Sequence, residues 1–61
     1  MEAMMTTVGM YTVKLEPLGD NYRVQVTAKG GHYEGLMRPT FQEALTLFKA
    51  RVNELRRSLN A

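Results

Sequence analysis

The chain has 61 residues, of which 44% are hydrophobic and 23% are charged, and its formal net charge is +2. A chain this short forms one domain that buries only about 60% of its unfolded surface, and its composition is neither that of a disordered segment nor that of a membrane span. With no cysteine and one histidine, it excludes disulfides, thiolate metal sites and histidine-rich metal sites, so we expect no metal and no cofactor.

The first nine residues come before any clear strand or helix pattern. They contain one charged residue, Glu2, and lack the basic and apolar regions of a signal peptide. We interpret residues 1–9 as a flexible N-terminal extension and residues 10–61 as a single domain. A cysteine-free chain with this start is expected to be cytoplasmic.

Three segments have the pattern of β-strands. Residues 11–16 and 22–28 alternate apolar and polar side chains, which is typical of half-buried strands, and residues 32–37 form a weaker third strand. The intervening residues 17–21 and 29–31 are rich in turn formers, with glycines in the second turn that suit a hairpin.

A change of period after Arg38 predicts a helix. Thr40 and Glu43 have the spacing of a capping box, in which the threonine hydroxyl and the glutamate carboxylate satisfy free amides at a helix start. Apolar residues then recur every three or four positions, so we predict an amphipathic helix over residues 41–59.

The element order predicts an α+β domain: a three-stranded antiparallel sheet (β-β-β-α) with the C-terminal helix packed on one face. The sheet side chains expected to face the helix are Tyr11, Val13, Leu15, Tyr22, Val24, Val26 and Tyr33. The helix side chains expected to meet them are Phe41, Leu45, Phe48, Val52 and Leu55.

No set of side chains predicts catalysis. His32 lies beside a glycine turn, where side chains are normally solvated, and no second histidine is available as a base. Glu16 and Glu34 are expected on the open sheet face, but their basic neighbours Lys14 and Arg23 make a solvated charge mosaic the better interpretation. We therefore predict a protein that is not an enzyme and has no small-molecule substrate.

The exposed sheet face is one candidate binding surface. Lys14, Arg23, Gln25 and Lys29 are expected to project from it, and such side chains can contact phosphates or base edges. The glutamates on the same face would repel phosphate, so nucleic-acid binding is the alternative hypothesis rather than the first.

The helix and the strand edges form the other candidate surface. Leu47, Arg51 and Glu54 lie outside the main apolar stripe and are predicted to contact a protein partner. The strand interrupted by Gly35 protects its own edge, so the opposite edge of the sheet is the better docking site. A chain this small also gains from pairing with a copy of itself, and we expect a homodimer.

The stretch from Tyr11 to about Leu55 resembles the HicB-like antitoxin family and its solitary single-domain members. The residues that carry the resemblance are the first strand with Pro17, the aromatic-led second strand at 22–26, and the helix start at 40–45. The resemblance implies a small β-β-β-α fold, frequent dimerisation and neutralisation of a protein partner.

The segments 22–26 and 40–44, with the glycine turn between them, are also similar to the arm-binding N-terminal domains of tyrosine-type integrases. That resemblance implies DNA binding by the open sheet face. Small inhibitors from phages and other mobile elements, including anti-CRISPR proteins, share the size range by analogy only. Our first expectation is a stoichiometric binding protein of the antitoxin or inhibitor type.

Overall fold

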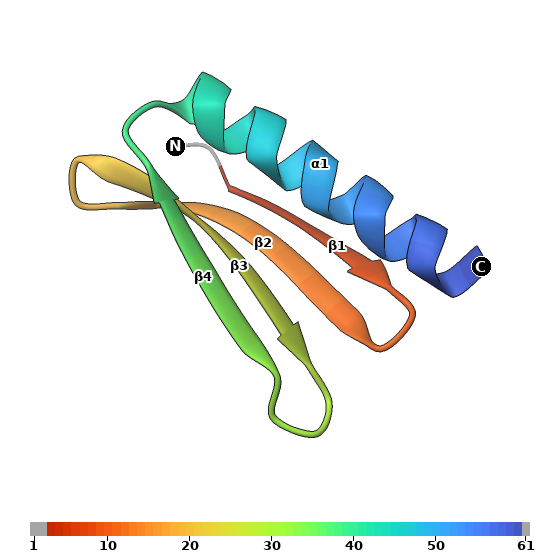
Figure 1. Cartoon of the computed structure of the whole chain (residues 1–61). Helices are drawn as coiled ribbons and strands as arrows, with labels where there is room; N and C mark the ends of the chain where they lie inside the picture. The colour runs from red at the N-terminus through yellow and green to blue at the C-terminus, as the bar shows by residue number, and fades with distance from the viewer. Residues whose placement is uncertain (1–2, 61) are drawn as a thin grey trace.

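The described part of the chain, residues 3–60 of the computed structural model, forms a single antiparallel sheet with one long helix across one face (Figure 1). The strands lie side by side in chain order, each joined to the next by a short turn. The elements are β1 (Met4–Val8), β2 (Tyr11–Leu18), β3 (Asn21–Ala28), β4 (Tyr33–Arg38) and α1 (Phe41–Asn60). The α+β class with one C-terminal helix is confirmed, but the prediction of three strands is wrong, because the sheet has four.

The additional strand, β1, lies within the segment interpreted as a flexible extension. It pairs with β2 from Val8 opposite Tyr11 to Met4 opposite Leu15, and Val8 is buried in the core. Residues 1 and 2 of that segment lie outside the described residues. The sequence of β1 hides its period, because each of its first two residue types occurs twice in succession and so falls on both faces of the strand.

Glycines with positive φ make the two tightest turns. Gly9 (φ 60°) and Gly19 (φ 64°) each occupy the first position of a two-residue connection between paired strands. Glycine is favoured there because a side chain is strained at positive φ, and such turns match the twist of the flanking strands. The third connection, residues 29–32, is longer and contains Gly30 and Gly31, both with positive φ.

One face of the sheet and one stripe of α1 make the core. The stripe predicted from the helical period contributes buried Phe48, Val52 and Leu55, as expected, together with fully buried Ala44. From the sheet, the most deeply buried side chains are Val13, Leu15, Val24 and Val26, also as expected. Tyr11, Tyr22, Phe41, Leu45 and Leu47 are partly buried against this core.

The last strand is oriented opposite to the prediction. Val26 faces the core and pairs with Glu34, so Glu34 lies on the helix side of the sheet. Tyr33 therefore points to the open face, where 58% of it is exposed, so its predicted core position is wrong, as is the open-face position of Glu34. A shift of one residue exchanges the two faces of a strand. Here the shift is tolerated because Arg51 of α1 neutralises the inward carboxylate.

Half of the predicted capping box is present at the start of α1: the Thr40 hydroxyl satisfies a free amide as predicted, whereas the Glu43 carboxylate bonds to the Thr40 hydroxyl instead of the Thr40 amide. The Thr40 hydroxyl accepts a hydrogen bond from the Glu43 amide at 3.2 Å and donates one to the Glu43 carboxylate at 2.8 Å. The helix ends at Asn60, one residue beyond the predicted end. The cap fixes where α1 starts and therefore which side chains it presents to each strand.

Candidate functional site

The free edge of β1 offers an unprotected row of main-chain groups. β1 and β4 are the two edge strands of the sheet, and β1 contains neither a charged residue nor a proline. Val8 and Tyr11 flank a two-residue turn, so their main chains form hydrogen bonds with each other. Hydrogen-bonded and outward-pointing residues alternate along an antiparallel edge strand, so the amides and carbonyls of Met5 and Thr7 point away from β2. These groups are available to another strand.

The opposite edge, β4, is protected by charge. It carries Glu34, which is tied to the helix, and Arg38, whose guanidinium donates a hydrogen bond to the main-chain carbonyl of Met37 at 2.7 Å. Charged side chains on an edge strand oppose pairing with a further strand. The two edges are therefore chemically different, and β1 is the one that invites a partner.

A groove of about 390 Å³ lies between the β1 edge and α1. Its lining residues are Met4, Met5, Thr6, Phe48, Lys49, Val52, Asn53 and Arg56. Phe48 and Val52 are core residues, each 6% exposed, whereas Met4 is 39% exposed and Met5 is 65% exposed. The groove thus has an apolar floor that continues the core and a wall formed by one flank of the helix.

That flank of α1 is cationic. Lys49, Asn53 and Arg56 follow one another at intervals of four and three residues, so they form one row along the helix, and all three are exposed. No acidic residue lines the groove among residues 3–60, and neither cation forms an ion pair there. The two positive charges of the row therefore border the groove and would attract a negatively charged segment bound there.

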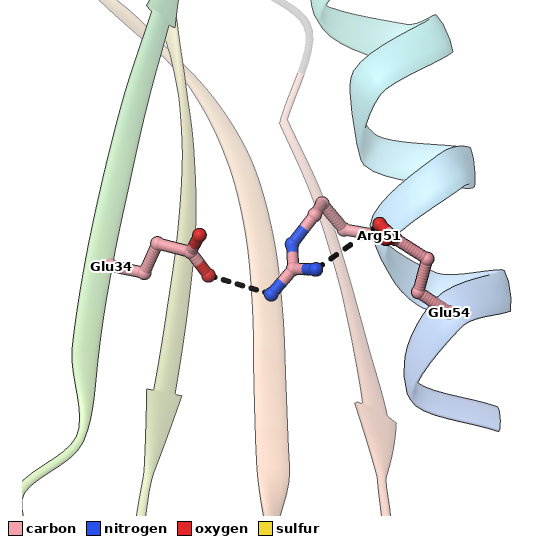
Figure 2. Close-up of polar contacts among 3 residues, drawn as sticks. All are labelled: Glu34, Arg51 and Glu54. Atoms are coloured by element: carbon pink, nitrogen blue, oxygen red, sulfur yellow. Dashed lines mark hydrogen bonds and ion pairs between the residues drawn. The ribbon is translucent and has the colours of Figure 1, made fainter. Parts of the chain in front are cut away.

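On the other flank of α1, two acidic residues bind a different cation, Arg51. Figure 2 shows its guanidinium between Glu34 of β4 and Glu54 of α1, with distances of 2.6 Å and 3.1 Å. Hydrogen bonds to Glu54 and then to Glu34 raise the pKa of Arg51. This network joins the helix to β4. The Arg51 side chain is only 22% exposed and is already bound to residues of its own chain.

The helix surface predicted to bind a partner is consequently only partly free. Leu47 is half-buried against the core, Arg51 serves the network just described, and Glu54 keeps 55% of its side chain exposed while bound to Arg51. The three residues do lie near one another on α1, but on the side of β4. The exposed cationic row and the free strand edge lie together on the side of β1.

The open sheet face brings three of its four predicted residues together. Lys14 lies opposite Gln25, and Glu16 lies opposite Arg23 at the next pair on the same face of the sheet. Lys29 lies in the turn after β3, where it is exposed. Three of the side chains predicted to contact nucleic acid therefore share a surface, but the carboxylate of Glu16 lies among them.

Arg23 and Glu16 form an ion pair on that face. Arg23 Nε donates to Glu16 at 3.1 Å, and Arg23 Nη2 contacts the same carboxylate oxygen. These hydrogen bonds, with a smaller contribution from Lys14, hold the pKa of the Glu16 carboxyl below its ordinary value. The pair neutralises one of the two cations of β2 and β3, and the other, Lys14, forms no ion pair with any of residues 3–60.

Candidate catalytic groups are not assembled. His32 is exposed in the turn before β4 and stacks edge-on against Tyr11 with ring centroids 6.0 Å apart. The two glutamates considered as a pair lie on opposite faces of the sheet. Within the described residues, no three histidine, aspartate or glutamate side chains gather into a metal-binding group.

Sequence reasoning missed the groove because it did not recognise β1. The four-and-three spacing of Lys49, Asn53 and Arg56 was visible as a polar row, yet only the position of β1 shows that this row borders a sheet edge. The prediction that the edge away from the glycine-interrupted strand is the better docking site corresponds to the β1 edge in this structure, and it stays a prediction.

Comparison with protein-family models, with characterised proteins and with solved structures gave no match. The HicB-like and integrase resemblances therefore stay predictions. Over residues 3–60, the structure has no helix with the length and apolar character needed to cross a membrane. The fold defines the class: a small α+β domain built from a four-stranded meander and one helix.

Proposed function

We propose that this chain is a stoichiometric binding protein that receives an extended segment of another protein at the β1 edge. The observation that carries the proposal is the coincidence of an uncharged edge strand with an open groove beside it. Strand addition draws its affinity from main-chain hydrogen bonds and its specificity from alternate side chains that enter neighbouring pockets. The β1 edge supplies the first requirement and the groove the second.

The open sheet face supports nucleic-acid binding less well. Because Glu16 neutralises Arg23, Lys14 is the one cation of β2 and β3 on that face without an ion-pair partner among residues 3–60. Binding through phosphates needs several cations, and a carboxylate among them opposes it. The charge arrangement thus favours a protein partner.

A role of the antitoxin or mobile-element inhibitor type fits such a surface. A protein of this kind acts by occupying its target in a fixed ratio, and it needs a complementary surface rather than a reactive group. The HicB-like sequence features at the second strand and the helix cap motivate the antitoxin form of the proposal. A homodimer is the other association expected for so small a chain.

The test uses one edge position, Thr7, in two variants. Thr7→Pro removes an amide that points away from β2, so it blocks an incoming strand while sparing the pairing within the sheet. Thr7→Val keeps that amide and the branched side chain, and it is the matched control. Each protein is immobilised, exposed to a lysate of the source cells, and its captured proteins are identified by mass spectrometry and quantified.

We expect the wild type and Thr7→Val to retain the same protein in a fixed ratio, and Thr7→Pro to lose it while its circular dichroism spectrum stays unchanged. Retention of that protein by a folded Thr7→Pro variant would show that binding does not use the β1 edge. The proposed function would then be wrong in its site. Failure of the wild type to retain any protein in a fixed ratio would overturn the proposal as a whole.

A further inference from the structure

From the charge and spacing of the groove, we infer that the segment received at the β1 edge is acidic, with two carboxylates flanking an apolar side chain. The inference rests on the proposed function and specifies the chemistry of its partner. The cationic row of α1 runs beside the free edge, and no acid lines the groove among the described residues.

The geometry sets the spacing of the acids. Lys49 and Arg56 are seven residues apart, which is about 10.5 Å along a helix. An added strand would run beside α1, because β1 itself does so (Figure 1). Side chains on one face of a strand recur about every 6.8 Å, so two acids four residues apart are about 14 Å apart, within reach of both cations. The residue midway between them would lie over Phe48 and Val52, which favours an apolar side chain there.

A second copy of this chain fits the groove poorly. Antiparallel pairing of two β1 strands about a two-fold axis makes one continuous sheet with both helices on the same side. The flanks that then face each other would be the cationic rows of both copies, with Lys49 and Arg56 contributed twice. Like charges brought together without a counter-charge disfavour association. An acidic strand supplies the counter-charge instead.

A nucleic-acid strand also fits poorly. Phosphate oxygens accept hydrogen bonds but do not donate them, so they would leave the outward carbonyls of Met5 and Thr7 without partners. A polypeptide strand offers donors and acceptors in alternation, which is what an edge strand requires. Two cations are also few for binding through phosphates.

The test uses three fluorescein-labelled, end-capped peptides that differ only in charge. The acidic probe is Thr-Glu-Thr-Val-Thr-Glu-Thr, and the other two carry glutamine or lysine in place of both glutamates. Binding is measured by fluorescence anisotropy at about 0.05 M and about 0.3 M salt, a range over which exposed charge pairs are increasingly screened. We expect the acidic probe to bind about tenfold more tightly than the lysine probe at low salt, with a smaller ratio at high salt.

Charge variants test whether Lys49 and Arg56 of the groove cause the preference for the acidic probe. The double variant Lys49→Glu with Arg56→Glu is expected to invert the order of the probes. Lys14→Glu with Arg57→Glu changes the net charge by the same amount at exposed positions outside the groove lining, so it should keep the order. Thr7→Pro should abolish binding of every probe, because it acts on the strand edge and not on the charges.

The outcomes separate the two proposals. If all three probes bind equally and Thr7→Pro abolishes binding, strand addition stands and the acidic preference is overturned. Failure of the acidic probe to bind also overturns the preference, while the capture experiment decides separately on the proposed function. A wild-type dimer that Thr7→Pro converts to a monomer would identify a second copy as the occupant. Binding of fluorescein-labelled duplex DNA by the wild type more tightly than the acidic probe, with loss of that DNA binding in the Lys49 and Arg56 double variant, would identify a nucleic-acid site. Either result overturns the inference.

Discussion

The ion pair on the open sheet face shows how one neighbour sets the behaviour of a single side chain. Glu16 and Arg23 are directly opposite on β2 and β3, and each keeps about a third of its side chain exposed. Hydrogen bonds from Arg23 stabilise the ionised carboxylate and so lower its pKa. The pair removes charge from the face that nucleic acid would contact, and this can be measured directly.

A pH titration tests that pair. The pKa of Glu16 is lowered in the folded protein, so the stabilisation from its ionised form is complete above its ordinary pKa of 4.5 and is lost as the pH falls through the folded value. Arg23→Gln should raise the pKa of Glu16 toward the ordinary value, as measured by NMR of the side-chain carboxyl. Lys14→Gln is the control and should raise it less. Equal titration in the wild type and Arg23→Gln would show that the pair does not form.

Residue orientation in β4 marks a limit of sequence reasoning. Alternation alone allows Tyr33, Gly35 and Met37 on the core side or Glu34, Leu36 and Arg38 there. Hydrophobicity favours the first choice, because it keeps a tyrosine inside and a glutamate outside. The structure takes the second, since Arg51 supplies an ion-pair partner from a helix seventeen residues away. A tertiary contact of that kind is not visible in the local pattern.

Among the elements, β1 departs most from the sequence interpretation. The helix, β2 and β3 were predictable because capping, periodicity and turn residues agree with one another in those segments. In β1, methionine and threonine each fall on both faces, so the inward set of Met4, Thr6 and Val8 does not stand out from its neighbours. β1 is recognised as a strand from its pairing with β2, and Val8 is its one deeply buried side chain.

Substitutions in β1 distinguish a packed strand from a loose extension. Val8 is 5% exposed, so Val8→Ala removes two buried methyl groups and should lower the free energy of unfolding by about 2 kcal/mol. Met5→Ala, at a position that is 65% exposed, is the control and should change it by less than about 0.5 kcal/mol. Urea unfolding followed by circular dichroism gives both values. If Val8→Ala were also neutral, β1 would not be part of the folded domain.

The start of α1 makes a separate prediction. Thr40→Ala removes the hydroxyl that accepts a hydrogen bond from the Glu43 amide. It should lower the free energy of unfolding, measured in urea, by about 1 kcal/mol. Thr40→Ser retains a hydroxyl in the same place and should recover most of the loss. An unchanged midpoint in Thr40→Ala would mean that the cap contributes nothing, and that the helix start is fixed by packing alone.

On the scale of the whole molecule, the two sides of the sheet and its two edges are used differently. One face is covered by α1 and the other is open (Figure 1). The β4 edge carries charged residues and β1 carries none. The position of the uncharged edge beside a cationic helix flank follows from the order β1-β2-β3-β4, in which β1 ends the sheet. The candidate site is thus a product of topology, which explains why local sequence patterns predicted the helix but not the groove.

The most direct test of strand addition at β1 is amide hydrogen exchange measured by NMR, free and in the presence of the acidic probe peptide. In the free protein, the amides of Thr6 and Val8 should be protected by β2, and those of Met5 and Thr7 should exchange rapidly. Binding at the edge should slow exchange at Met5 and Thr7 and leave β4 unchanged. Unaltered exchange at those two amides, with new protection in β4 or on the open face, would contradict binding at the β1 edge.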